Sequence, residues 1–429
     1  MKLPTAWRPT VFMGEFMSSQ VDLQCPIKDG GIRVTNFFNG RLLTGADMSR
    51  EQTAQREIML RLGTAVGEGV IYGLEVTKTP NSTNTRPAVT VKAGVAINRN
   101  GQTLTLTSDV EVSLIKQTTS SASAGTSGFG ECQPLEEGMY IADPGVYLLS
   151  ISSAQTTEGR ATVSGLGNTL ASCNTDTKIV SVQFRLQTLN LTTSDLNPPS
   201  HLRNRVAYKC FGVSDQRTSA FLKNPFGPSL TNYGLLDDLR PNQLTNDDVP
   251  LAVINWTPAD GIRFIDLWSV RRYLARPTPS SNWAWFVGER RLREAEAMFL
   301  QFQEQVKEMR ETESNLHTIE AMTRFDYLPP VGILPLTGVG GAQGFNYQKF
   351  FADQEYHPPV LIEGASIDYL IRASLMYAPI SLQNKDPLRL YQITEGTTQR
   401  SYMIFVSAFV PFPEDTRFST VRWDYSNFV

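Results

Sequence analysis

Histidine and cysteine are the side chains that most often bind transition metals or transfer protons, and this sequence has few of either. None of the histidines (His201, His317 and His357) lies in an H-E-x-x-H or similar metal motif. No two cysteines form a C-x-x-C pair; they are Cys25, Cys132, Cys173 and Cys210. We therefore predict structural histidines, free buried thiols of a reducing compartment, with one disulfide as the alternative, and no metal or other cofactor.

Motifs for nucleophilic or phosphate chemistry are incomplete. The string nearest to G-x-S-x-G runs from Gly125 to Phe129 and has phenylalanine where glycine is needed. Glycines between 338 and 344 resemble a phosphate cradle, but Pro335 interrupts the preceding segment and no helix pattern begins after Gly344. We predict a Pro/Gly hinge over residues 327–344.

Paired carboxylates could in principle cleave glycans. Asp237-Asp238 and Asp247-Asp248 lie in a polar loop, where adjacent acids are usually solvated rather than held across a sugar ring. Three aromatic residues could bind sugar if exposed, although such residues more often belong to cores or interfaces: Trp283, Trp285 and Tyr347. We expect no catalytic residues and no enzyme activity.

Composition limits the classes of partner. The chain has 429 residues, a net charge of −3 and a pI near 5.8, which gives no support for nucleic-acid binding. No segment approaches the ~18 apolar residues of a membrane span, and the first ten residues lack a signal-peptide pattern. We expect synthesis in the cytoplasm and no direct insertion into a membrane.

The opening module, residues 36–115, is expected to be a helix followed by β-strands. Asp47 is the expected N-cap of an amphipathic helix, Glu51 is favoured by the helix dipole, and Gly63 is the expected stop. Alternating apolar residues then predict strands, with Asn100-Gly101 as a hairpin turn. Because nothing in the module is reactive, we predict a docking interface made of Phe37, Phe38, Leu42, Leu43, Asp47 and Glu51. The alternative is that these residues form the core of the first β-domain.

The rest of the chain predicts an α+β fold. Residues 1–35 suggest an extended arm or, as the alternative, a disordered tail. Residues 116–280 suggest a β-sandwich-like region with long loops, and residues 345–429 a small mixed α/β domain. Two hairpins are expected, over residues 249–274 and in the C-terminal domain, and a further strand over 206–213.

A long helix is expected from about Glu289 to Ile319, within residues 281–326. Its apolar residues alternate at spacings of three and four, as in a coiled coil: Leu292, Ala295, Phe299, Phe302, Val306, Met309 and Leu316. The helix either packs within its own domain or forms a bundle with other copies. Because a narrow seam needs partner helices and the sequence has no second one, we favour an oligomer seam.

The opening module resembles the N-terminal segment of proteins encoded with phage-tail-like contractile injection systems. The matching positions are Asn39, Gly40, Leu42, Leu43, Thr44, Asp47, Glu51, Gln52, Gly69, Val70, Gly73, Leu74, Val76, Val91, Gly94, Ala96, Ile97 and Gly101. The layout is also similar to the type VI secretion baseplate adaptor (TssK) family, in which a β-rich shell precedes a helical shoulder and a small head. This chain departs from that family in having one long helix.

The resemblance implies a structural particle component without an active site. Its partners would be copies of itself, in a trimer or alternatively a dimer, and other baseplate, wedge or sheath proteins, at the baseplate or in its peripheral cage or fibre network. Such a chain would be made in the bacterial cytoplasm and incorporated into the particle. The alternative interpretation is a receptor- or glycan-binding module like that of a tail fibre, motivated by the β-rich middle and the aromatic C-terminal region.

Overall fold

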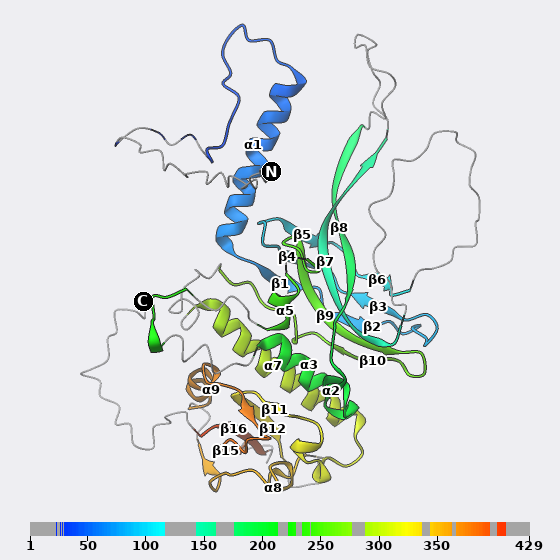
Figure 1. Cartoon of the computed structure of the whole chain (residues 1–429), viewed down its shortest axis with the longest axis vertical. Coiled ribbons are helices and arrows are strands. Elements are labelled where there is room, and N and C mark those ends of the chain that lie inside the picture. Colours follow the sequence, from blue (N-terminus) through cyan, green and yellow to red (C-terminus); the bar gives the residue numbers. More distant parts are fainter. Residues whose placement is uncertain are drawn as a thin grey trace, which may run out of the picture. The chain divides into compact units, whose positions relative to one another are not determined.

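The computed structural model describes most of the chain. The described residues are 23, 26, 28, 30–115, 143–159, 176–212, 222–228, 234–240, 242–276, 288–336, 344–362, 366–394 and 401–408. Two compact units are distinguished, Met1–Met59 and Leu60–Val429. Helices alternate with several small sheets along the chain (Figure 1), so the predicted α+β class is confirmed.

Helix α1 (Gly45–Val66) begins in a capping box. The Thr44 hydroxyl accepts a hydrogen bond from the Asp47 backbone N–H at 3.2 Å, and the Asp47 carboxylate accepts one from the Thr44 backbone N–H at 3.1 Å. This reciprocal pair satisfies two backbone donors that the start of the helix would otherwise leave unpaired. The N-cap is therefore Thr44, and the predicted Asp47 is its partner three residues later.

Gly63 does not end α1, contrary to the prediction. A Cβ at this position would lie 2.1 Å from the carbonyl oxygen of Gly101, so Gly63 lets the helix touch the turn between two strands. The helix instead ends before Gly67, whose φ of +126° suits glycine. A Cβ on Gly67 would lie 2.1 Å from the carbonyl oxygen of Ala275, so this position also needs glycine for a close approach.

A two-layer β-region opens the unit Leu60–Val429. One layer is a four-stranded antiparallel sheet in the order β10-β9-β7-β8, and the other holds two three-stranded sheets, β1-β4-β5 and β2-β3-β6. Their bounds are β1 (Gly69–Gly73), β2 (Val76–Lys78), β3 (Ala88–Val91), β4 (Gly94–Ile97), β5 (Thr103–Leu106), β6 (Val110–Ser113), β7 (Gly145–Glu158), β8 (Thr177–Thr188), β9 (Asp248–Thr257) and β10 (Gly261–Asp266).

One apolar core joins these layers. Side chains of the small sheets, such as Val89 and Leu104, pack with Leu149 and Leu251 of the large sheet. The strands of residues 69–113 are therefore half of the sandwich rather than a separate module, which corrects the predicted boundary at residue 115. The hairpins at Asn100-Gly101 and Asp260-Gly261 are confirmed, because both glycines have the positive φ that their turns require.

Helix α3 (Leu202–Phe211) covers the other face of the large sheet, with the short helices α2 (Thr193–Leu196) and α5 (Leu235–Asp238) beside it. Val206 and Cys210 of α3 pack in one core with Val146 and Leu148 of β7 and Val253 of β9. Three short 3-10 turns complete the helical elements of the described part of the chain: Pro199–His201, Leu316–Thr318 and Ala321–Thr323.

The strand predicted over residues 206–213 is wrong, because α3 occupies this stretch. Val206 packs against the large sheet, whereas Ala207 and Tyr208 pack towards α7. Burial on two sides makes these consecutive positions apolar, and a short apolar run does not distinguish a buried helix from a strand.

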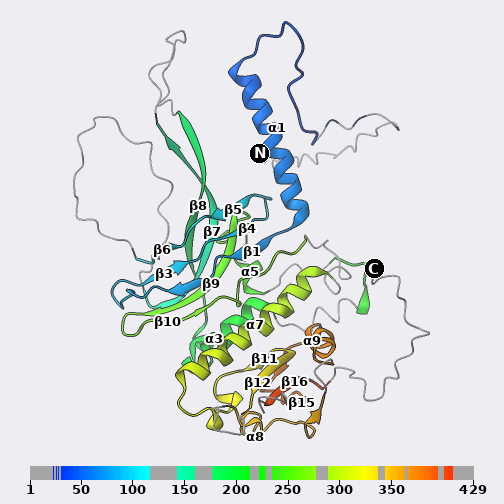
Figure 2. The same ribbon diagram turned by 180° about the vertical axis from the view of Figure 1, so that it is seen from behind.

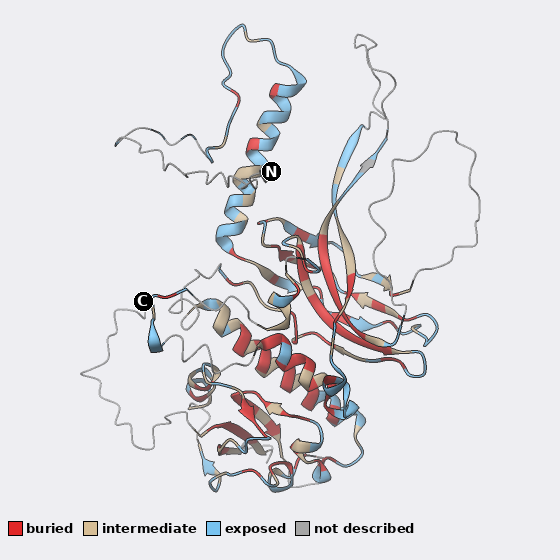
Figure 3. Ribbon diagram, viewed as in Figure 1, coloured by how far each residue is buried: buried red, intermediate tan, exposed pale blue. Residues whose placement is uncertain are grey.

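Helix α7 (Glu289–Thr312) runs between α3 and the C-terminal sheet, and both views show it there (Figures 1 and 2). Ala297 and Met298 face α3, whereas Phe302, Val306 and Met309 face the C-terminal sheet. Burial along this helix is extensive (Figure 3). The helix ends at Thr312, before the predicted end at residue 319.

The C-terminal part is a four-stranded mixed sheet in the order β12-β16-β15-β13, with a two-stranded sheet of β11 and β14 beside it. The bounds are β11 (Tyr327–Leu328), β12 (Val331–Pro335), α8 (Tyr347–Phe350), β13 (Val360–Leu361), α9 (Ile367–Leu375), β14 (Ile380–Ser381), β15 (Leu388–Thr394) and β16 (Ser401–Ser407). Helix α7 covers one face of the mixed sheet and α9 packs on the other. The predicted C-terminal hairpin is confirmed as β15 and β16.

The predicted hinge over residues 327–344 is wrong for the part that the structure describes. Val331–Pro335 pairs with β16 along its whole length, and Leu334 is fully buried. Proline is tolerated because Pro335 is the last residue of the strand. Gly338, Gly340 and Gly341 lie outside the described residues.

Candidate docking surface

Large apolar side chains are exposed together in the segment that precedes α1 and in its first turn. In the unit Met1–Met59 the exposed fractions are 53% for Phe37, 63% for Phe38, 89% for Leu42 and 56% for Leu43. Met48 is half exposed in the same stretch. Within this unit these side chains are therefore largely exposed.

Polar contacts hold this segment against the start of α1. The Thr35 hydroxyl donates to the carbonyl oxygen of Asp47 at 3.1 Å, and the Thr35 backbone N–H donates to the Glu51 carboxylate at 3.3 Å. Arg41 donates to the carbonyl oxygen of Asn36 at 2.8 Å and forms an ion pair with Asp47. The segment is thus tied at both ends, and the apolar side chains between the ties face solvent.

The turn within the segment presents Phe38. The backbone N–H of Arg41 donates to the carbonyl oxygen of Phe38 at 3.2 Å, and Gly40 takes a φ of +88°, a conformation that suits glycine. The Arg41 guanidinium lies 6.0 Å from the centre of the Phe38 ring, at the outer limit of a cation–π contact. The turn leaves the ring exposed at one end of the segment.

Asp47 and Glu51 hold the segment against the start of α1. Hydrogen bonds from Thr44, and then Arg41, lower the pKa of the Asp47 carboxyl below its usual value, so it is ionised at neutral pH. Asp47 is buried, and Glu51 is half-buried with its carboxylate bonded to Thr35. Of the six predicted docking residues, the four apolar ones are exposed and these two acids support them.

We name the set Phe37, Phe38, Leu42 and Leu43 the apolar docking segment. Exposed apolar side chains also continue on α1, at Met59, Leu62 and Val66. Ala54, Ile58 and Leu62 are spaced by four residues, which predicts one shared apolar face, but Ala54 is buried and Leu62 is 57% exposed. Residues four apart on a helix share a face, but each can have different neighbours, so the spacing alone does not predict that all of them are buried.

The predicted oligomer seam is wrong for four of the six residues that we assign to it, which are Leu292, Phe299, Phe302, Val306, Met309 and Leu316. Phe302, Val306, Met309 and Leu316 are buried in the core that α7 shares with the C-terminal sheet, so they are not available to another copy. Phe299 packs beside α9, and Leu292 remains 41% exposed. Sheet residues supply the covering partners that a second helix would have provided. The number of copies stays a prediction.

Other described residues that were considered for chemistry are packed or hydrogen-bonded within the fold. His201 pairs through Nδ1 with Asp326 Oδ1 at 2.7 Å, and Cys210 is a buried free thiol whose pKa burial raises to about 12. Tyr347 packs against the core around α7 rather than forming an exposed sugar platform. Trp283 and Trp285, like the other three cysteines, lie outside the described residues.

In each pair of adjacent acids, one carboxylate is bonded to an arginine. Asp248 is buried and bonded to Arg185 at 2.5 Å, and Asp237 forms an ion pair with Arg290 at 2.8 Å. Both acids are held by arginines, which the sequence could not show because the partners are 63 and 53 residues away, respectively. In the described part of the chain, no group of three or more histidine, cysteine or acidic side chains is placed to hold a metal ion.

Comparison with protein-family models and with curated protein sequences found no match. Among the described helices, none is long and apolar enough to cross a membrane.

Proposed function

We propose that this chain is a structural component of a contractile injection system particle, located at the baseplate or in its peripheral cage or fibre network. It acts by docking onto other particle proteins and by self-association, in a trimer or a dimer. It is made in the bacterial cytoplasm and then incorporated into the particle. The exposed apolar docking segment carries this proposal.

The chemistry of the segment supports a protein partner. Clustered exposed aromatic and leucine side chains mark interaction sites, because leaving them in water costs free energy that burial against a partner recovers. Aromatic residues are enriched at the centres of such interfaces. The ties through Thr35, Arg41 and Asp47 hold the segment in one conformation before binding, which lowers the entropy cost of association.

Substitution of Phe38 and Leu42 tests the docking role. We expect F38D and L42D to fold like the wild type, because both side chains are exposed, and to lose co-purification with baseplate proteins from cells that make the particle. L361D is the matched control, since Leu361 is 74% exposed at a different place in the chain.

The control should co-purify normally. Retention of F38D and L42D in the particle at the wild-type level would contradict the docking role, and so would equal loss of L361D. A wild-type chain that is strictly monomeric by light scattering and binds no particle protein would contradict the proposed function itself. Binding of the isolated chain to cell-surface glycans would instead favour a receptor-binding module.

A further inference from the structure

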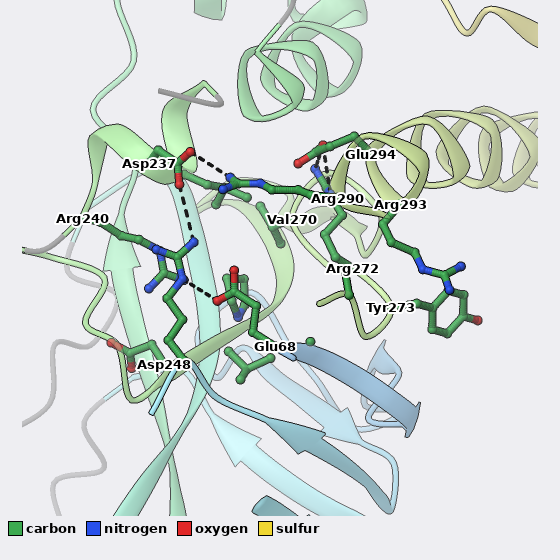
Figure 4. Close-up of a pocket in the computed structure, with 16 residues that line it drawn as sticks. Glu68, Asp237, Arg240, Asp248, Val270, Arg272, Tyr273, Arg290, Arg293 and Glu294 are labelled. Atoms are coloured by element: carbon green, nitrogen blue, oxygen red, sulfur yellow. Dashed lines mark hydrogen bonds and ion pairs between the residues drawn. The ribbon is translucent and has the colours of Figure 1, made fainter. Parts of the chain in front are cut away.

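A pocket of about 80 Å³ in the unit Leu60–Val429 is lined by an unusual number of arginines (Figure 4). They come from the β4–β5 turn, the residues after α5, the segment after β10 and the first turns of α7: Arg99, Arg240, Arg272, Arg290 and Arg293. The acidic side chains that line the same pocket are Glu68, Asp237, Asp248 and Glu294.

Two of these acids are already paired away from the centre of the pocket. Glu294 bonds to Arg272 at 2.8 Å, and Asp248 bonds to Arg185, which does not line the pocket. Arg293 bonds to Glu296 at 2.9 Å, and in Figure 4 it points towards Tyr273 rather than Arg240.

Among the described lining residues, the centre therefore contains three cations (Arg99, Arg240 and Arg290) and two anions (Glu68 and Asp237). Arg99 forms an ion pair with Glu68 and lies 3.7 Å from Asp237, which also bonds to Arg290 at 2.8 Å. Arg240 is the third cation. Its Nη1 donates to the carbonyl oxygen of Thr245 at 2.9 Å, and no carboxylate among the described residues forms an ion pair with it.

The electrostatics of Arg240 agree with this excess of positive charge. Burial, and then the positive charge of Arg99, lower the pKa of Arg240 to about 10, against the opposing charges of Glu68 and Asp237. Figure 4 shows the Arg240 side chain on the same side of the pocket as Asp237 and Glu68. A bound anion would offset both the burial and the repulsion between the guanidinium groups of Arg240 and Arg99.

We propose that this pocket binds one small oxyanion, a phosphate or carboxylate group, at the guanidinium of Arg240. The planar guanidinium fork offers paired donors that match the oxygens of either group. One negative charge would balance the three arginines against Glu68 and Asp237. The proposal is independent of the docking segment and of the proposed function.

Titration of the full chain with inorganic phosphate and, separately, with acetate tests the site at constant ionic strength with chloride as the reference anion. We expect one phosphate or acetate to bind per chain by calorimetry, and the preferred anion to identify the ligand class. R240Q should lower that affinity at least tenfold, and R240K should lower it less because it keeps the charge but not the fork.

R263Q is the matched control, because Arg263 is an exposed arginine of β10 outside the pocket. It should bind the anion like the wild type. The proposal is overturned if neither anion binds beyond the chloride reference, or if R240Q and R240K bind as well as R263Q. If R240Q does not fold, a lower affinity of R240K than of R263Q supports the proposal, and an equal affinity overturns it.

Discussion

At the scale of single residues, Glu304 combines a buried carboxylate oxygen with a raised pKa. It lies on α7 near Asp266, Arg203 and Glu308, and its Oε2 is buried without a hydrogen-bond partner among the described residues. Burial, and then the negative charge of Asp266, raise the pKa of Glu304 to about 7. The carboxylate form is therefore unfavourable in the folded protein at neutral pH.

Replacing Glu304 with glutamine should remove this penalty. Because the folded-state pKa is about 7 and the usual value is 4.5, the folded wild type loses stability as pH rises between these values. We expect E304Q to match the wild type near pH 4.5 and to exceed it by up to about 3 kcal/mol above pH 7. Urea unfolding at several pH values measures this difference.

The exposed residue Glu311 of the same helix supplies the control, and E311Q should leave the pH dependence unchanged. If E304Q were less stable than the wild type at pH 8, the carboxylate would instead be stabilised by Arg203.

At the scale of elements, the apolar side chains of α7 and α1 are not covered in the way that their sequence patterns predicted. The heptad-like pattern of α7 is satisfied inside the chain, because its two sides face α3 and the C-terminal sheet. Helix α1 instead keeps several apolar side chains exposed, although its pattern predicted one buried face. An apolar stripe indicates that a helix is covered, but it does not specify whether a sheet, a helix or another chain covers it.

Phe302 distinguishes an internal core from an interface on α7. We expect F302A to destabilise the fold by about 3 to 5 kcal/mol, because it leaves a cavity among the rings of Phe325 and Phe405. L292A should cost far less, since Leu292 is 41% exposed. Chemical denaturation measures both changes. A dissociated but equally stable F302A chain would show that the residue serves an interface.

At the scale of the whole molecule, the β-sandwich and the C-terminal sheet are connected through α3 and α7. The Asn204 side chain of α3 binds the backbone at β11: Nδ2 donates to the Tyr327 carbonyl oxygen at 3.0 Å, and Oδ1 accepts hydrogen bonds from the backbone N–H groups of Asp326 and Tyr327 at 2.9 and 3.1 Å. The His201–Asp326 pair lies beside this contact. The two parts should therefore unfold together.

Removal of the Asn204 amide tests this connection. We expect N204A to leave three backbone groups without their partner and to lower stability by about 2 to 3 kcal/mol. Calorimetry should show one transition for the wild type and a lower or divided transition for N204A. N84A is a control, because Asn84 also bonds to a distant carbonyl, that of Ala259, but is exposed. Equal losses in both variants would argue against a special connection at Asn204.

Local sequence determined the turns, most strands and the position of the long helix in this protein. Asn100-Gly101 and Asp260-Gly261 specify hairpins because their glycines reach positive φ at little cost. Alternating apolar residues indicate β8, whereas longer apolar runs indicate β7 and β9, which are buried on both faces. Phe37, Phe38, Leu42 and Leu43 are exposed, and their docking role stays a prediction.

Only the tertiary structure decided what covers each apolar surface and which charges meet. Phe302 is buried by strands that follow it in the chain, and Arg240 meets Arg99 from a distant part of the sequence. Periodicity reports which side of a helix is apolar, and composition reports how many charges exist. Neither contains the distances between remote segments, on which burial and electrostatic interaction depend.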